Sequence, residues 1–310
     1  MKKLGLVLLG LLLALPAHAE REFIDLAGRV VVVPDRIERV SGADASANAL
    51  LLAAAPERRA DVAIPAPPED LFPSALALIR ARVSAGVDPE AQVLFCGSAD
   101  ADLAAALEDA WGLPVLCLSE CLTDVPRALA LLQAALETDL GPQIDFARRA
   151  LESAPNVPDG TRPRTLCLGV DPLAAAEVLR LAGACPLGAP EDASPEALMG
   201  LDPNALLVGG DPGRGVSAFA AVMGLMEDPR LAKLPAIQEG RVRAVPDVPF
   251  SWFGPPAGPQ RLMGLYWAEK FLFPEAYADL DMAELTRTYL RLFCGLELSE
   301  DDMVRLLSLY

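Results

Sequence analysis

Short apolar runs bounded by glycine, proline and serine alternate along this chain with longer segments of helical periodicity. In the first half, Val93–Cys96 has the composition of a buried strand, and residues 103–111 follow as a helix that ends at Gly112. Residues 114–119 form the next apolar run. A strand, a helix and a strand within about thirty residues predict a right-handed βαβ unit with parallel strands.

The second half of the chain repeats this alternation. Two such halves, followed by a run of C-terminal helices, predict the α/β class, with two βαβ lobes and mainly parallel sheets. Ligands of such sheets bind at the carboxyl ends of the strands, so we expect a binding cleft where the two sets of strand ends face each other. The strands expected in the second half are residues 165–170, Ala205–Val208 and 241–245, and the helices are Pro172–Leu181 and 216–223.

A proline-containing stretch near the middle of the chain separates the two halves. Residues 155–163 are typical of a linker, and residues 143–153 before them have helical periodicity. We therefore expect residues 20–140 to form an N-terminal lobe and residues 141–155 to form a single connecting helix. Residues 156–310 then form a C-terminal lobe that carries the C-terminal helices.

The N-terminal end of the chain has the pattern of a secretory signal peptide. Lys2 and Lys3 precede an apolar run, which ends in an Ala-His-Ala cleavage site. We expect residues 1–19 to be removed, so that an exported, periplasmic protein begins at Glu20. No cysteine follows the apolar run, so we do not expect a lipid-anchored protein.

Charge and composition narrow the class of function. The formal net charge is −17, and nucleic acid and anionic membrane surfaces are poor partners for such a chain. The only histidine, His18, lies in the expected signal peptide, so the mature chain lacks an imidazole for a nucleophilic dyad or a metal site. The sequence also lacks the G-x-S-x-G, P-loop and dinucleotide-binding patterns. We therefore expect a binding protein without a cofactor, and not an enzyme.

An aromatic segment near the C-terminus is the strongest candidate for a ligand contact. Residues 250–253 read Phe-Ser-Trp-Phe and lead into Pro255 and Pro256. An aromatic ring held between turn residues can present a flat apolar face to a ligand, so we expect Trp252 to lie at the mouth of the cleft and to stack on the ligand. The alternative, equally open for Phe250, is that these rings fix the loop to the core of their own lobe.

The same segment resembles the C-terminal signature of periplasmic substrate-binding proteins that serve ABC importers of iron-siderophore, haem and cobalamin complexes. The resemblance rests on Trp-Phe-Gly-Pro-Pro at 252–256, on residues 261–267 and on Phe-Pro-Glu at 273–275, and the segment around Gly28 agrees with it. It implies two lobes joined by a single connecting helix. It also implies a small-molecule metal complex as ligand and, as partner, an ABC permease with its ATPase in the inner membrane. We expect a monomer.

Polar residues at the expected strand ends complete the candidate cleft. Asp and Ser at such positions are also common helix caps and turn residues, which is the alternative for each of them. Convergent carboxylates and hydroxyls suit a ligand with amide, hydroxyl or cationic groups, and the scarcity of arginine nearby disfavours an anionic siderophore. The candidate ligand-binding residues are Phe250, Ser251, Trp252, Phe253, Asp247, Ser98 and Asp211, with Asp100, Ser119, Glu120 and Asp171 at the other strand ends.

Two charged residues match positions of the family pattern. Arg261 follows the Pro-Pro loop, where it could contact the ligand. We favour the alternative that it pairs with an acidic residue or caps a neighbouring element. Glu196 occupies the place where similar proteins direct a glutamate towards arginines of the permease, so we expect it to dock the permease. A carboxylate in the first turn of a helix is the compatible alternative, because the helix dipole stabilises it there.

The six cysteines allow two interpretations. Cys96, Cys117 and Cys121 lie at or just beyond the ends of neighbouring strands, and Cys167, Cys185 and Cys294 follow later. One hypothesis is a thiolate metal site formed by the first three. We favour a disulfide with a buried thiol, because an exported chain with an even number of cysteines permits disulfides and no Cys-x-x-Cys pair is present.

Together these features predict the periplasmic solute-binding component of an ABC transporter. It would capture an iron-siderophore or corrinoid-like metal complex in the cleft between its lobes and deliver it to the permease. The rival interpretation is a periplasmic enzyme or a thiol-based metal handler that uses the same architecture.

Overall fold

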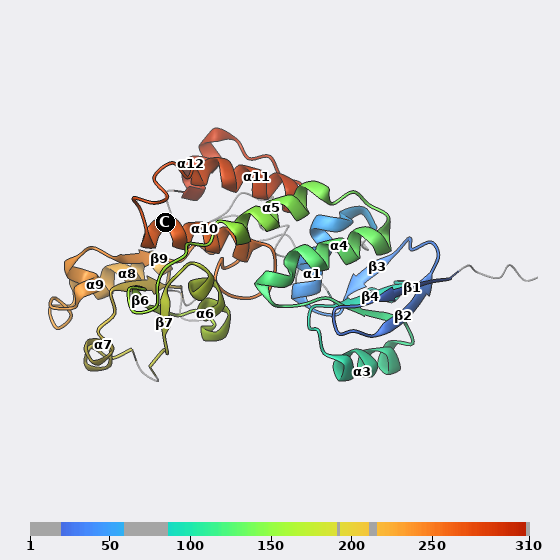
Figure 1. Cartoon of the computed structure of the whole chain (residues 1–310), viewed down its shortest axis with the longest axis horizontal. Coiled ribbons are helices and arrows are strands. Elements are labelled where there is room, and N and C mark those ends of the chain that lie inside the picture. The colour runs from blue at the N-terminus through green and yellow to red at the C-terminus, as the bar shows by residue number, and fades with distance from the viewer. Residues whose placement is uncertain (1–19, 59–85, 191–192, 211–215, 308–310) are drawn as a thin grey trace, which may run out of the picture.

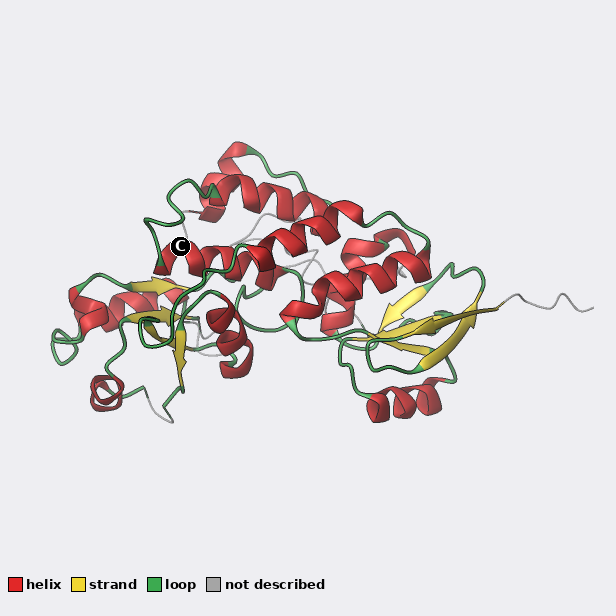
Figure 2. Cartoon of the chain, viewed as in Figure 1, coloured by secondary structure: helices red, strands yellow, loops and turns green. Residues whose placement is uncertain are grey.

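The computed structural model describes residues 20–58, 86–190, 193–210 and 216–307. Within these residues, two parallel sheets lie towards the two ends of an elongated molecule, and a layer of helices runs across between them (Figures 1 and 2). The expected signal peptide, at residues 1–19, lies outside the described residues.

The N-terminal lobe begins with a two-stranded antiparallel hairpin that turns through Gly28, whose φ of 80° favours glycine. A three-stranded parallel sheet of order β3-β4-β5 follows. The strands are β1 (Glu20–Ile24), β2 (Val30–Pro34), β3 (Val40–Gly42), β4 (Val93–Cys96) and β5 (Val115–Cys117). The helices are α1 (Ala45–Ala54), α3 (Ala101–Trp111), α4 (Val125–Leu136) and α5 (Gly141–Glu152), with 3-10 turns at Pro56–Arg58 and Leu122–Asp124.

The C-terminal lobe contains a four-stranded parallel sheet of order β7-β6-β8-β9. Its strands are β6 (Arg164–Leu168), β7 (Cys185–Leu187), β8 (Ala205–Val208) and β9 (Val242–Ala244). The helices are α6 (Pro172–Leu181), α7 (Pro195–Leu201), α8 (Ala218–Glu227), α9 (Pro235–Gln238), α10 (Gln260–Leu272), α11 (Met282–Cys294) and α12 (Glu300–Leu307).

The two faces of each sheet belong to different cores. In β4, Val93 and Phe95 join the main hydrophobic cluster, whereas Leu94 and Cys96 pack on the other face with Ala104 of α3. Strand β8 repeats this division. Ala205 and Leu207 join the main cluster, whereas Leu206 and Val208 join a second cluster with residues of α7 and α8. A strand buried on both faces needs an uninterrupted apolar sequence, which explains the short continuous runs in this chain.

The main cluster is shared by both lobes and is centred on α10. Ten of the thirteen residues of α10 are buried, and the helix packs against α5, α6 and α11. Apolar residues of α1 and α4 from the first lobe join the same cluster. The two lobes are therefore joined by a continuous apolar layer as well as by the chain itself.

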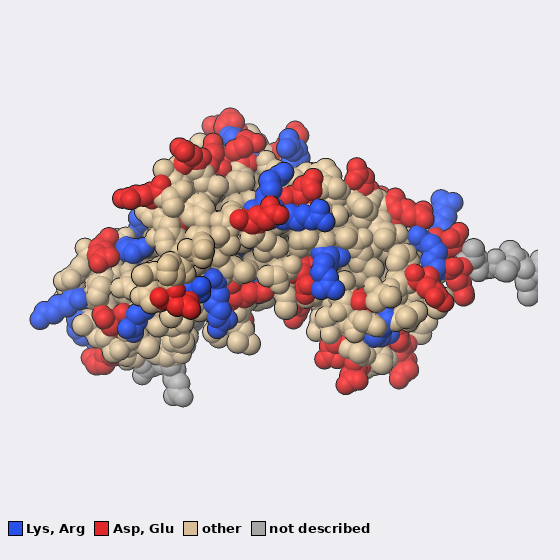
Figure 3. Space-filling model, in the orientation of Figure 1, with Lys and Arg blue, Asp and Glu red and all other residues tan. Residues whose placement is uncertain are grey.

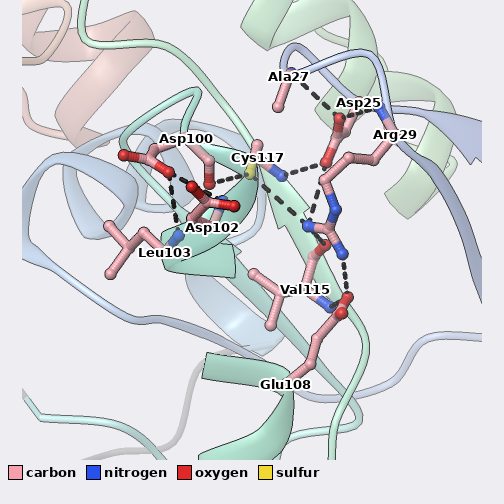
Figure 4. Close-up of polar contacts among 9 residues, drawn as sticks. All are labelled: Asp25, Ala27, Arg29, Asp100, Asp102, Leu103, Glu108, Val115 and Cys117. Carbon is pink, nitrogen blue, oxygen red and sulfur yellow. Dashed lines mark hydrogen bonds and ion pairs between the residues drawn. The ribbon is translucent and has the colours of Figure 1, made fainter. Parts of the chain in front are cut away.

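A polar network fixes the N-terminal hairpin to the first sheet (Figure 4). Arg29 points from the hairpin turn to Glu108 of α3, and it also donates to the Cys117 sulfur at 3.8 Å. Asp25 accepts from the Cys117 backbone N–H at 3.2 Å. The hairpin is thus held beside β5 and α3.

The predicted α/β class is confirmed. The predicted bounds of β4, α6 and β8 match the observed ones. Strands β3 and β7 escape prediction because each has three residues, and Val-Ser-Gly and Cys-Pro-Leu lack an apolar run. None of the described helices has both the length and the apolar character needed to cross a membrane.

The helix expected at residues 141–155 corresponds to α5. Every strand of the three-stranded sheet precedes α5 in the chain, and every strand of the four-stranded sheet follows it. We retain this helix as the proposed boundary between lobes at residues 20–140 and 156–310.

The contact between α10 and the loop before it generates a stability prediction. A Cβ atom at Gly264 would overlap the Trp252 carbonyl oxygen and lie 2.9 Å from its carbonyl carbon. We expect Gly264→Ala to lower the free energy of unfolding by about 3 kcal/mol, measured by chemical denaturation. The control is Gly224→Ala in α8, where a Cβ meets nothing within 4 Å, and a gain of up to about 1 kcal/mol is expected. Equal effects of the two substitutions would contradict this account.

A buried carboxyl group predicts a pH dependence of stability. Glu269 of α10 is fully buried and accepts from the Ser153 hydroxyl at 2.9 Å, and burial raises its pKa from 4.5 to about 7. Between these pH values the folded chain keeps a proton that the unfolded chain releases, so the stability contributed by this group falls as the pH rises.

We expect the difference in unfolding free energy between Glu269→Gln and the wild type to shift in favour of the variant by about 3 kcal/mol from pH 4.5 to pH 8. Urea denaturation across this range measures the difference. The exposed Glu275→Gln is the control. A difference between Glu269→Gln and the wild type that does not vary with pH would show that Glu269 ionises freely in the folded chain.

Candidate functional site

A cavity of about 400 Å³ lies between the two lobes, at the carboxyl ends of strands from both sheets. Its walls come from the start of α1 and the segment after β5 on one side, and from α6, α10 and the loop before α10 on the other. The space-filling view is also notched between the lobes (Figure 3). The lining residues are Ser46, Glu120, Cys121, Asp171, Leu173, Ala174, Glu177, Gly254, Pro255, Ala257 and Arg261.

On the N-terminal side, the start of α1 is held against the end of β4. The Asp44 carboxylate accepts from the backbone N–H of Ala47 at 2.8 Å and from that of Gly97 at 2.7 Å. This capping places Ser46, whose hydroxyl donates to the Glu120 carboxylate at 3.3 Å and accepts from the Ala257 N–H at 3.0 Å. Ser46 thereby connects the first lobe to the loop of the second.

On the C-terminal side, Asp171 caps α6 by accepting from the Ala174 N–H at 2.8 Å. An aspartate in this position satisfies a backbone donor that the helix leaves unpaired. Leu173 follows in the first turn and is 82% exposed, so an apolar side chain stands at the edge of the cavity. The cavity therefore offers both carboxylate oxygens and apolar surface to a ligand.

An ion pair between the buried Arg261 and the partly exposed Glu177 lines the cavity. Arg261 is 3% exposed, and it also donates to the Glu120 carbonyl oxygen at 3.2 Å. The other Glu177 oxygen accepts from the Leu122 backbone N–H at 2.7 Å. The pair thus ties α10 and α6 to the segment that follows β5 in the first lobe.

The cavity has an acidic character. Among the described residues of the lining, Glu120, Asp171 and Glu177 contribute three carboxylates, whereas Arg261 contributes a single guanidinium, which is already paired with Glu177. A charge that is removed from water is stabilised mainly by opposite charge and by hydrogen-bond donors. The cavity therefore favours a ligand with cationic or donor groups over an anionic one.

The aromatic residues 250–253 do not line this cavity, and the expectation that Trp252 lies at the mouth of the cleft is wrong. Trp252 is 2% and Phe253 0% exposed, and both belong to the main core. The Trp252 indole donates to the Val248 carbonyl at 3.0 Å, and Phe250 packs against the same core. The rings are buried because the loop lies directly on α10. The position of Trp252 therefore agrees with the alternative interpretation, in which the ring fixes the loop to the core.

The other predicted site residues fall into two groups. Ser251, Asp247 and Ser98 are half-buried and do not line the interlobe cavity, and Asp211 lies outside the described residues. Glu120 and Asp171, which the pattern of strand ends also marked, do line it. Glu177 was not predicted from the sequence, because the local sequence does not show that a glutamate in the second turn of a helix faces a cavity.

The charged residues matched to the family pattern are also placed. Arg261 pairs with an acidic residue, as favoured from the sequence. Glu196 is exposed in the first turn of α7, so both of its interpretations remain compatible, and its docking role stays a prediction.

The cysteines do not form the predicted disulfide. All six are free, and Cys96 and Cys117 are paired in register on neighbouring strands within the core. Burial raises the pKa of Cys96 to about 12 and that of Cys117 to about 11, so both stay protonated at neutral pH, whereas a metal binds the thiolate. Cys121 is exposed and lines the cavity. Among the described residues, no group of three Cys, His, Asp or Glu side chains is arranged to hold a metal ion.

Two parallel sheets, a shared helical layer and an interlobe cavity together give the fold of periplasmic solute-binding proteins of ABC transporters. An ABC transporter solute-binding protein from Sulfurospirillum deleyianum is similar over 93% of this chain and 99% of its own, with 18% identity and a TM-score of 0.69. The Haemophilus influenzae periplasmic protein MolA, solved with molybdate, is similar over 90% and 99%, with 17% identity and a TM-score of 0.63. Helicobacter pylori CeuE, solved as a nickel–histidine complex, is similar over 93% and 98%, with 14% identity and a TM-score of 0.60.

No protein-family model matches the sequence, and no curated protein matches it significantly. At these low identities, the similarity to solved structures establishes the fold and leaves the ligand open.

The ion pair in the lining of the cavity predicts a large effect of single substitutions. Arg261→Gln leaves Glu177 with one fewer partner in a partly buried site, so we expect a loss of about 3 kcal/mol in unfolding free energy. The exposed pair of Arg287 and Glu300 serves as the control, and Arg287→Gln should cost less than about 1 kcal/mol. Chemical denaturation measures both. The double variant Arg261→Gln/Glu177→Gln should be less destabilised than the sum of the two single changes, and strict additivity would count against the pair.

Proposed function

We propose that this chain is the periplasmic solute-binding component of an ABC importer, which captures a small metal complex between its lobes and delivers it to the permease. The observation that carries the proposal is the cavity at the carboxyl ends of strands from both sheets, whose walls come from both lobes. Ligands of α/β proteins bind at this edge. The volume of about 400 Å³ lies within the range of small-molecule sites.

The lining of the cavity supports a particular ligand chemistry. Glu120 and Asp171 present carboxylates, Leu173 and Pro255 present apolar surface, and Arg261 is already paired. A compact metal complex with cationic or hydrogen-bond donor groups suits this lining. An iron-siderophore of this kind is a better match than a corrinoid-like complex, because a cavity of this size holds a compact ligand.

The ligands of similar structures do not carry over to this chain. MolA was solved with molybdate and CeuE with a nickel–histidine complex, so one fold accommodates different ligands. Molybdate is an oxyanion, and the excess of carboxylates over guanidinium in this cavity opposes its binding.

The rival function, a thiol-based metal handler, finds less support. It requires several thiolates at one place, but Cys96 and Cys117 are buried with raised pKa values and Cys121 is the one cysteine of the cavity lining. An enzyme on this architecture would need a reactive group in the cavity that the proposed capture does not need.

The delivery step requires a surface for the permease. Glu196 is exposed at the start of α7, and we assign it the docking role that the family resemblance implies. A monomer with one interlobe cavity is the simplest unit for this task, and size-exclusion chromatography with light scattering measures its mass.

The experiment begins with the ligand. Native mass spectrometry of the protein isolated from the periplasm of its source should show an additional mass, which identifies the bound complex. Calorimetric titration of the unloaded protein with that compound should then give a 1:1 stoichiometry. We expect Asp171→Asn and Glu120→Gln each to weaken binding by about tenfold, because each removes one carboxylate charge from the cavity.

Asn also caps helices well, so Asp171→Asn should leave stability nearly unchanged. The matched control is Asp281→Asn, which alters the capping aspartate of α11 outside the cavity and should leave affinity unchanged. A compound that binds equally well to all three variants would place its site elsewhere and remove the support for this function.

A further inference from the structure

A second large groove lies at the opposite edge of the C-terminal sheet. It has a volume of about 700 Å³ and contains the residues at or just before the first positions of all four strands. Parallel strands place these amino ends on the edge opposite the interlobe cavity. The groove is lined by Asp159, Gly160, Thr161, Arg162, Pro163, Arg164, Arg180, Ala184, Cys185, Pro186, Asn204 and Arg241.

The groove has a strongly positive lining on an acidic protein. Among the lining residues that the structure describes, four guanidinium groups, from Arg162, Arg164, Arg180 and Arg241, accompany a single carboxylate, that of Asp159. The chain as a whole has a net charge of −17, and Asp and Glu side chains are spread over the face shown in Figure 3. The groove is therefore a local reversal of the surface charge.

Neutral backbone carbonyls hold most of these arginines in place. Arg164 donates to the Leu201 carbonyl at 2.6 Å and Arg241 to the Leu272 carbonyl at 2.9 Å. Arg162 donates to the Val157 carbonyl at 3.2 Å and also lies 3.3 Å from Asp159. A carbonyl fixes the direction of a guanidinium without neutralising its charge, so the remaining donors stay available for an oxyanion.

Arg180 completes the set from the last turn of α6. It is exposed and makes no ion pair with any residue that the structure describes. Guanidinium groups bind carboxylate and phosphate oxygens in a bidentate manner, and several in one concave site favour ligands with more than one such group.

We propose that this groove is a second binding site, which takes a small polyanion with phosphate or carboxylate groups. Its location separates it from the cavity proposed for transport, and its charge is opposite. The site does not depend on that function, because none of its lining residues lines the interlobe cavity.

Two exposed cysteines provide a test within one molecule. Cys185 lines the groove and Cys121 lines the interlobe cavity. Alkylation by iodoacetamide, followed by peptide mass spectrometry, reports each thiol separately. Tripolyphosphate at millimolar concentration should slow alkylation of Cys185 at least about fivefold and leave Cys121 unaffected, because a ligand shields the thiol it covers. Citrate, in a parallel arm, shows whether carboxylates act like phosphates.

A charge-reversed variant and its control complete the design. Arg180→Glu should weaken tripolyphosphate binding, measured by calorimetry, by about tenfold or more. Arg148→Glu changes net charge equally at an exposed site on α5 outside the groove, and should have little effect. Equal weakening in both variants, or slowing of Cys121 as well as Cys185, would mean that the anion responds only to overall charge and would overturn the proposal.

The outcome is independent of the transport proposal. Glu120→Gln in the interlobe cavity should leave the protection of Cys185 by tripolyphosphate unchanged. If neither tripolyphosphate nor citrate protects Cys185, the second site is rejected, while the titrations of the interlobe cavity stand.

Discussion

The ion pair of Arg261 and Glu177 is the interaction on which the rest of the site depends. A guanidinium that is 3% exposed has lost most of its hydration, so it requires acceptors nearby. It finds them on α6 and on the segment after β5, and these two elements lie in different lobes. These contacts thereby hold the two walls of the cavity together.

The packing of α10 places a second constraint on the lobes. The helix is surrounded by α5, α6 and α11, and the main cluster continues into α1 and α4. Wide separation of the lobes would expose this continuous apolar layer to water, at a cost that grows with its area. Closure around a ligand is therefore expected to be a small adjustment of a preformed cavity. Gly264 permits the arrangement, because the loop that carries Trp252 lies directly on its backbone.

Parallel strand direction separates two environments on one sheet. At the carboxyl ends, Asp171 caps a helix and lines the acidic interlobe cavity. At the amino ends, Arg164 and Arg241 are held by backbone carbonyls and line the basic groove. The linings of the two edges carry opposite charge, so they favour different ligands. One protein can therefore carry two sites of opposite charge.

The sequence by itself determined the class of fold, because strands buried on both faces require the continuous apolar runs seen in Val93–Cys96 and Ala205–Val208. It also marked Glu120 and Asp171, since residues at the carboxyl ends of parallel strands converge. Only the tertiary structure decided the position of Trp252, because proline and glycine neighbours indicate a turn but not what covers it. It alone brought Glu177 and Arg261 together and collected four arginines in one groove, since long-range contacts between elements leave no trace in local periodicity.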